Sequence, residues 1–276
     1  MRVDALLALG TARLKGRVER PRLEAEILLA HLLGKPRIWL HTHPETEVAC
    51  EAAFNELIGR RAEAEPVEYL TGKASFYDFE LEVGKGVLIP RPETELLVDY
   101  AAKIIETKKI GRVCEIGVGS GAVSIALARR FPHLRIVATD ISETALAYAR
   151  RNIEALGVAG QIETVACDLM EGVDESVEMV VSNPPYIADD FPLDATVRQE
   201  PATALFGGRR GDEILRRIID ACVRRGVRDL VCEMGYDQRK SIAEYCRTLG
   251  LPKPTFYKDL AGLDRGFYLQ LKVKSE

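Results

Sequence analysis

The sequence lacks the features that would tie it to a membrane or to a nucleic-acid backbone. It has no apolar run near the roughly 18 residues that a membrane helix requires, so we expect no membrane partner. Its first residues show neither the long apolar segment nor the cleavage site of a signal peptide, which predicts a cytoplasmic protein. Lys and Arg number 38 against 42 for Asp and Glu, a net charge of −4. Tight nucleic-acid binding usually needs a basic excess, so we expect no stable nucleic-acid partner.

Metal-binding and disulfide patterns are also missing. None of the 6 cysteines forms a Cys-x-x-Cys pair, and most lie in apolar runs, which predicts reduced, buried thiols. Of the 4 histidines, His41 and His43 are close together, but no Cys or carboxylate pair stands nearby at ligand spacing. We therefore expect no metal site.

The sequence shows two kinds of secondary-structure pattern, one after the other. A chain of 276 residues can hold one large and one small domain. Residues 1–72 predict only helices, one from Pro21 to a cap at Gly34 and another near residues 45–61. Basic and acidic residues balance there, so we expect a small bundle that docks a partner or braces the larger domain. From 73 to 90, aromatic and β-branched residues between glycines predict a β-hairpin connector.

Residues 91–276 predict an α/β domain. After Gly111, short apolar strands alternate with amphipathic helices, a pattern typical of a Rossmann-like parallel sheet covered by helices on both faces. Ser142 is expected to cap one of these helices at its N-terminus. The last two strands have no helix between them, which predicts an antiparallel strand at the end of the chain.

A glycine-rich turn follows the first strand of this domain, in the run Glu115-Ile116-Gly117-Val118-Gly119-Ser120-Gly121. Glycines let the chain turn sharply and let a ligand approach the backbone, and the following helix presents free N–H groups. The next strand ends at Asp140, which can accept hydrogen bonds from both hydroxyls of a ribose. We therefore predict an adenosine pocket. The pattern also satisfies the relaxed dinucleotide fingerprint, so these residues alone leave NAD open as the ligand.

Asp168 ends the strand after that. In a pocket of this layout it is expected to lie beside the adenine, where its carboxylate can accept from the exocyclic amine. A plain strand-end cap is the alternative.

A second motif, Asn183-Pro184-Pro185-Tyr186, directly follows the fourth strand, at the sheet edge where ligands of such sheets bind. Proline has no N–H, so the prolines offer only carbonyl acceptors, and the Asn183 side-chain oxygen adds another. The motif predicts an acceptor fork for a planar –NH2 group of an amide, adenine or guanine, with Tyr186 as a stacking face. A Pro-Pro turn capped by Asn is the alternative.

The two motifs in this order resemble those of class I S-adenosylmethionine-dependent methyltransferases that modify planar amino groups. Two further segments narrow the resemblance: IPRPETE at residues 89–95 and EPATALFGG at residues 200–208. With the N-terminal helices, they look like the peptide-chain release factor glutamine methyltransferases over nearly the whole chain. One departure is Val118, where this family usually has Thr; the change removes a hydroxyl near the cofactor but keeps the glycine geometry.

The resemblance implies a seven-stranded methyltransferase sheet after an N-terminal substrate-docking domain. A monomer is our default expectation. It implies methylation of the side-chain amide nitrogen of the glutamine in the Gly-Gly-Gln motif of release factors, a modification tied to translation termination. The implied catalytic residues are Asn183, Pro184, Pro185 and Tyr186. The implied S-adenosyl-L-methionine site consists of Glu115, Gly117, Val118, Gly119, Ser120, Gly121, Asp140, Asp168 and Asn183.

Three other functions compete with this one. A nucleic-acid methyltransferase acting on adenine or guanine would share the second motif, but the chain after Tyr186 is needed to complete the sheet and leaves no target-recognition domain. An NAD(P)-dependent oxidoreductase would leave that motif without a role. A non-catalytic module, in which the helical bundle binds a partner, is opposed by the intact glycine loop, Asp140 and the acceptor fork.

Overall fold

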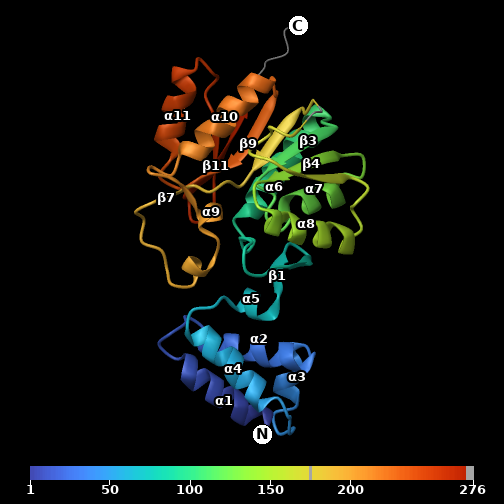
Figure 1. Ribbon diagram of the computed structural model, residues 1–276, viewed down its shortest axis with the longest axis vertical. Helices are drawn as coiled ribbons and strands as arrows, with labels where there is room; N and C mark the ends of the chain where they lie inside the picture. Colours follow the sequence, from blue (N-terminus) through green and yellow to red (C-terminus); the bar gives the residue numbers. More distant parts are fainter. Residues whose placement is uncertain (174–175, 272–276) are drawn as a thin grey trace. The chain divides into compact units, whose positions relative to one another are not determined.

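The structure is a computed structural model that describes residues 1–173 and 176–271 (Figure 1). The chain divides into two compact units. The first contains Met1–Lys73 together with Leu193–Gln199, and the second contains Ala74–Pro192 and the chain from Glu200. Within the described residues, no helix is both long and apolar enough to cross a membrane.

The first unit is built from helices around its own apolar core. Pro21 occupies the first turn of α2, where its missing N–H costs no hydrogen bond, and Gly34 ends that helix with a φ of 59°. Phe54 and Ile58 of α4 are fully buried against Leu6, Leu28 and neighbouring side chains. The helices are α1 Val3–Leu14, α2 Pro21–Leu33, α3 Arg37–Thr42, α4 Glu51–Ala62 and α5 Val67–Thr71.

The predicted helix near residues 45–61 is wrong in its first part, because α4 begins only at Glu51. The preceding residues pair with the start of the chain instead. The Val48 N–H donates to the Met1 carbonyl at 3.0 Å, and the Val3 N–H donates to the Thr46 carbonyl at 3.0 Å. Backbone groups committed to this pairing are not available for a helical turn.

A two-stranded sheet formed by β1 (Lys73–Phe76) and β2 (Phe79–Glu82) begins the second unit. Its alternate residues are buried, as expected for strands with one face on a core. Asn152 of α8 (Glu143–Ala155) bonds to both backbone groups of Glu82, accepting from its N–H at 2.7 Å and donating to its carbonyl at 3.0 Å.

The large sheet has seven strands in the order β10-β11-β9-β6-β3-β4-β5, and β11 runs antiparallel to the other six. This confirms the α/β prediction and the antiparallel last strand. Its central strands are buried on both faces, as their continuous apolar runs require. The strands are β3 Arg112–Ile116, β4 Arg135–Asp140, β5 Ile162–Ala166, β6 Met179–Ser182, β9 Asp229–Glu233, β10 Thr255–Lys258 and β11 Asp264–Gln270.

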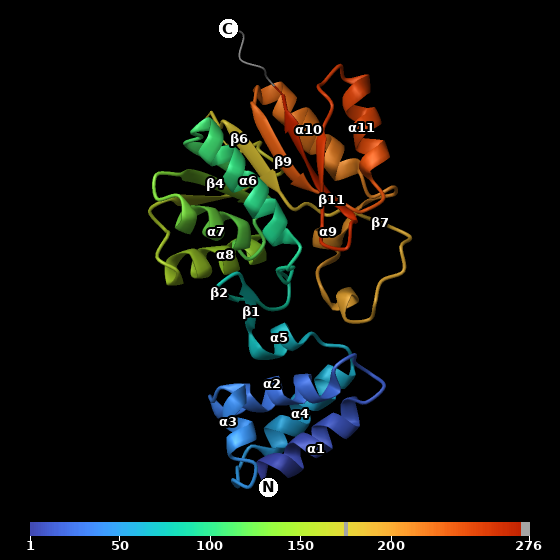
Figure 2. The ribbon, with the colours of Figure 1, turned by 180° about the vertical axis from the view of Figure 1, so that it is seen from behind.

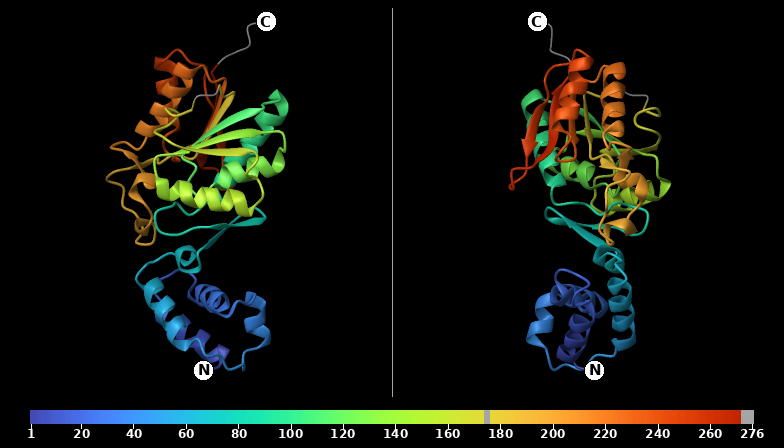
Figure 3. Two further views of the ribbon diagram at one scale, coloured as in Figure 1. Left: turned by 45° about the vertical axis from the view of Figure 1, so that its right-hand side comes forward. Right: turned by 90° about the vertical axis from the view of Figure 1, so that its left-hand side faces the viewer.

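Helices cover both faces of this sheet. α6 (Thr94–Lys108), α7 (Ala122–Arg130) and α8 lie on one face, and α10 (Glu213–Arg225) and α11 (Arg239–Thr248) lie on the other. Figures 1 and 2 view the two faces in turn, and Figure 3 shows the sheet between the two helix layers. Ser142 caps α8 as predicted, because its side chain accepts from the Ala145 N–H at 3.2 Å.

The strand order changes direction at β3, because β4 lies on one side of β3 and β6 lies on the other. In an open α/β sheet, such a switch point creates a crevice at the carboxyl ends of the strands. The chain after β6 forms only short elements: β7 (Ile187–Ala188), the 3-10 turn Val197–Gln199, which belongs to the first unit, α9 (Ala202–Leu205) and β8 (Phe206–Gly208).

Candidate cofactor and substrate site

A cavity of about 300 Å³ lies at the carboxyl ends of the strands. It brings together residues that are far apart in the sequence, from the glycine loop, the ends of β4 and β5, and the Asn-Pro-Pro-Tyr motif. The predicted site residues that line it are Gly117, Gly119, Asp140, Asp168, Asn183, Pro184 and Pro185. Its apolar wall includes Val87, Leu88, Ile116, Ile141, Leu169, Phe206 and Ile214.

The glycine loop and Asp140 form one hydrogen-bonded unit. Gly119 has a φ of +54°, and a Cβ built on it would find no heavy atom within 4 Å, so its face is open. Its N–H donates to Asp140 Oδ2 at 3.0 Å, while the Ser142 N–H donates to Oδ1 at 2.9 Å. Burial raises the pKa of Asp140, and these backbone donors oppose that rise by favouring the ionised carboxylate. The loop thus holds a carboxylate at the cavity wall.

The other predicted residues of the glycine loop are not among the described residues that line the cavity. Glu115 is buried and accepts from the N–H and hydroxyl of Ser124, in the first turn of α7. Burial raises the pKa of Glu115 to about 8. Val118 is buried too, and the Ser120 carbonyl accepts from Asn152 at 2.9 Å. Gly121 begins α7 with a φ of +90°.

Asp168 faces the cavity but already has a charged partner. Its Oδ2 lies 2.5 Å from Nη2 of Arg217, a residue of α10 that also lines the cavity. Both side chains are nearly half exposed, so solvent weakens their attraction. Arg217 therefore stands beside the position where an adenine amine was expected to meet Asp168.

Asn183 is held by a hydrogen-bonded chain that reaches into the core. Its Nδ2 donates to Thr94 Oγ1 at 2.9 Å, and Thr94 Oγ1 donates to Glu233 Oε2 at 2.8 Å. The Tyr186 hydroxyl donates to the other Glu233 oxygen at 3.0 Å. Neither Thr94 nor Glu233 was assigned a role from sequence. The register of the sheet shows why Glu233 belongs here. Ser182 pairs with Cys232, so the next residues, Asn183 and Glu233, lie at neighbouring strand ends.

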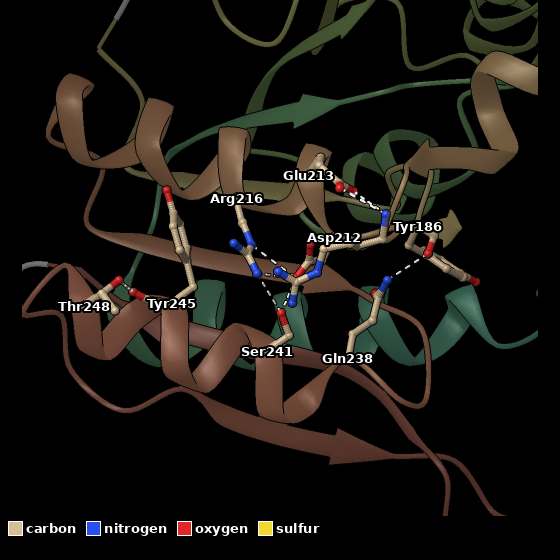
Figure 4. Close-up of polar contacts among 9 residues, drawn as sticks. Tyr186, Asp212, Glu213, Arg216, Gln238, Ser241, Tyr245 and Thr248 are labelled. Atoms are coloured by element: carbon tan, nitrogen blue, oxygen red, sulfur yellow. Dashed lines mark hydrogen bonds and ion pairs between the residues drawn. The ribbon is translucent and has the colours of Figure 1, made fainter. Parts of the chain in front are cut away.

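Tyr186 is fixed at its backbone as well as at its hydroxyl. Its carbonyl accepts from Gln238 Nε2 at 2.8 Å, as Figure 4 shows, and Gln238 Oε1 accepts from the Gly235 N–H at 2.9 Å. Burial raises the pKa of the Tyr186 phenol, so it stays protonated as a donor. Tyr186 is not among the described residues that line the cavity, and the stacking role predicted for it stays a prediction.

The second half of EPATALFGG packs directly against the Asn-Pro-Pro-Tyr backbone. A Cβ built on Gly207 would lie 2.5 Å from the Pro185 carbonyl oxygen and 2.3 Å from that of Gly211. A Cβ on Gly211 would lie 2.5 Å from the Tyr186 carbonyl oxygen. Real Cβ atoms do not approach so closely, so glycine at these positions lets two backbone segments meet.

The first residue of that segment supports another part of the site. The buried carboxylate of Glu200 accepts from the Ile89 N–H at 2.9 Å and pairs with the Arg91 guanidinium. The IPRPETE and EPATALFGG segments, about 110 residues apart in sequence, are thus joined by one carboxylate. The contacts of Glu200 with Ile89 and Arg91 thus hold the loop that precedes Thr94.

Two segments match described protein families. Residues 5–72 match the PrmC N-terminal domain, and residues 93–200 match the methyltransferase small domain. A release factor glutamine methyltransferase of Rhodopirellula baltica is 40% identical over 275 residues, covering 91% of this chain and 90% of that protein. One from Bordetella pertussis is 37% identical over 259 residues, covering 90% of this chain and 95% of its own length.

Solved structures with low sequence identity share the fold of the larger unit. The human hMettl16 catalytic domain in complex with MAT2A 3'UTR hairpin 6 superposes with a TM-score of 0.59 at 18% identity, covering 70% of this chain and 77% of that one. A ribosomal protein L11 methylase from Lactobacillus delbrueckii subsp. bulgaricus has a TM-score of 0.52 at 19% identity, covering 70% and 84%. These similarities extend to the fold alone.

Proposed function

Because this chain belongs to the release factor glutamine methyltransferase family, we propose that it methylates the side-chain amide nitrogen of the glutamine in the Gly-Gly-Gln motif of peptide-chain release factors, with S-adenosyl-L-methionine as donor. One observation carries this proposal. The open glycine loop with Asp140 and the acceptor motif at Asn183 and Pro184 line the same cavity, so donor and amide can meet there.

The chemistry of the cavity fits the donor. Asp140 offers carboxylate oxygens for ribose hydroxyls, and the open face of Gly119 lets a ligand approach the backbone. Apolar side chains such as Ile141 and Leu169 suit an adenine ring. When bound, S-adenosyl-L-methionine supplies an electrophilic methyl group. The predicted loop residues that do not line the cavity, Glu115, Val118, Ser120 and Gly121, would hold this backbone in shape.

The protein's task is to make an amide nitrogen react. That nitrogen is a poor nucleophile because its lone pair is delocalised into the carbonyl. Asn183 Oδ1 and the Pro184 carbonyl accept its two N–H bonds, orient the lone pair, and become stronger partners as positive charge develops on nitrogen. Positioning of this kind contributes several kcal/mol to many enzymatic reactions. A general base is not required, since a proton can leave after methyl transfer.

The partner we propose is the release factor itself, with residues 1–72 docking it and the protein acting as a monomer. The separate core of the helical unit supports a role for it as an independent module. The chain's net charge of −4 opposes a nucleic-acid substrate.

The deciding experiment offers the full-length protein three substrates with methyl-labelled S-adenosyl-L-methionine: a bacterial release factor, total RNA and double-stranded DNA. We expect label in the release factor, lost when its Gly-Gly-Gln glutamine is replaced by alanine. Label in RNA or DNA but not in the release factor would overturn the proposal.

A further inference from the structure

We propose that Thr94 and Glu233 act as positioning residues that turn the Asn183 carboxamide so that its oxygen faces the substrate amide. This inference deepens the proposed function and rests on it. It assigns a role to two residues outside the Asn-Pro-Pro-Tyr motif, neither of which is expected to touch the donor or the substrate.

The two ends of a carboxamide have nearly the same shape but opposite hydrogen-bonding character. An acceptor fork works only if Asn183 presents oxygen to the substrate, because the Nδ2 end would set one N–H donor against another. A rotation of the terminal group by half a turn would exchange the two ends. Some neighbouring group must therefore make one orientation more favourable.

Thr94 supplies that preference through the direction of its own hydrogen bond. A hydroxyl has a single proton, and Thr94 Oγ1 donates it to Glu233 Oε2 at 2.8 Å. Its oxygen can then only accept from Asn183, and the atom it faces at 2.9 Å is Nδ2. The amino end is committed to Thr94, which leaves Oδ1 for the substrate.

Glu233 fixes the direction of all the hydrogen bonds in this series because an ionised carboxylate can only accept. It is 2% exposed, and it receives hydroxyl protons from Thr94 at one oxygen and from Tyr186 at the other. The same carboxylate thus orders both ends of the Asn-Pro-Pro-Tyr motif. Thr94 is itself 4% exposed, so water does not readily replace either partner.

Protonation of Glu233 would remove this order. A carboxylic acid at Oε2 could donate to Thr94, whose own proton would then be free to favour the Asn183 oxygen. Burial raises the pKa of Glu233 to about 7, and the bonds from Thr94 and Tyr186 oppose that rise. The other ionisable groups that act on it are Glu93 before α6, which raises the pKa, and Arg265 of β11, which lowers it; Tyr257 of β10 and Cys232 of β9 also lie close.

Three variants of the full-length protein test the hydrogen bonds made by Thr94. Thr94→Val keeps the shape but removes the hydroxyl, Thr94→Ser restores it, and Thr107→Val makes the same change at an exposed position of the same helix. We expect Thr94→Val to lower kcat for release factor methylation by about 10- to 100-fold, the usual effect of misplacing a reacting group. Thr94→Ser should recover most of that loss, and Thr107→Val should match the unaltered protein.

A pH profile tests Glu233 independently. The rate of the unaltered protein should fall as pH drops through about 7, whereas Glu233→Gln should be slow and should lose this dependence. The affinity for S-adenosyl-L-methionine, measured by calorimetry, should change much less than the rate in every variant, since neither Thr94 nor Glu233 is expected to touch the donor. Should Glu233→Gln fail to fold, the Thr94 series decides alone.

The outcomes separate this inference from the proposed function. If the unaltered protein does not methylate release factors at all, the proposed function fails. If it does, and Thr94→Val keeps the full rate and the same pH profile, the positioning role of Thr94 and Glu233 is wrong while the function stands. A loss in Thr94→Val that Thr94→Ser does not recover would also overturn the inference, because the hydroxyl would not be responsible.

Discussion

At the residue scale, the site depends on carboxylates whose surroundings give each a different task. Asp140 lines the cavity and accepts two backbone N–H bonds, so it can stay ionised despite the burial that raises its pKa. Glu115 lies two residues before the loop glycines and is turned away from the cavity, toward the first turn of α7. Both acids were predicted to contact the cofactor, and the geometry favours only Asp140 as a direct contact.

Replacing Asp140 with alanine tests this distinction. The variant loses the charge-assisted hydrogen bonds proposed for the ribose hydroxyls, so S-adenosyl-L-methionine binding should weaken by about 1.5–3 kcal/mol. Isothermal calorimetry measures the change. Asp78→Ala is a suitable control, because Asp78 is an exposed acid of the same unit whose partner is Arg129. Equal affinity in Asp140→Ala and the unaltered protein would place Asp140 outside the pocket.

At the scale of elements, the site depends on two backbone segments that approach very closely. β8 and the turn after it meet the Asn-Pro-Pro-Tyr segment through Gly207 and Gly211, where side chains would collide with carbonyl oxygens. The short pairing of β7 with β8 continues this contact. The position of the acceptor fork is thus set by packing from a segment some 20 residues later as well as by β6.

Gly207→Ala should disturb that packing. Its new Cβ must displace the Pro185 carbonyl, so we expect a loss of about 1–3 kcal/mol in the free energy of unfolding, as overpacking usually causes. Methylation should fall more than S-adenosyl-L-methionine binding does. Gly160→Ala provides the matched control, since a Cβ there meets no atom within 4 Å. Chemical denaturation and initial rates check both effects, and identical behaviour of the two variants would contradict the proposed packing role.

Hydrophobic periodicity and turn residues predict many of the helices and strands. The seven strands, the antiparallel end and the Ser142 cap follow from local patterns. The hydrogen bonds that join Thr94 to Asn183 and Glu233 do not, because the three residues are distant in sequence. The pairing of β6 with β9 brings Asn183 and Glu233 together, and Thr94 meets them from the first turn of α6. The start of α4 was missed for a similar reason, since residues 46–48 pair with the N-terminus rather than with their neighbours.

At the scale of the whole molecule, the chain consists of two units with separate cores. One is centred on residues such as Leu28 and Phe54, and the other on residues such as Val180 and Ile218. Every described residue that lines the proposed site belongs to the larger unit. Because the helical unit has a core of its own, we propose that it recognises the protein substrate.

Deleting residues 1–72 tests this division of labour. The shortened protein should bind S-adenosyl-L-methionine normally but methylate whole release factor much more slowly. A short Gly-Gly-Gln peptide, which needs no docking surface, should be affected far less. Calorimetry reports the first property and labelled methyl transfer the other two. An equal loss on protein and peptide would point to a structural role for the helical unit.

The central claim is that Asn183 accepts an N–H of the substrate amide. The most direct measurement is the initial rate of methyl transfer to release factor by Asn183→Ala, with circular dichroism as the control for folding. Asn183→Asp serves as the matched variant, because it keeps an acceptor oxygen and should retain more activity than alanine. We predict that Asn183→Ala folds normally and loses about 10²–10³ in rate, the usual cost of removing one preorganised hydrogen-bond partner. A folded Asn183→Ala protein with nearly full activity would contradict the acceptor-fork mechanism and reduce the motif to a turn.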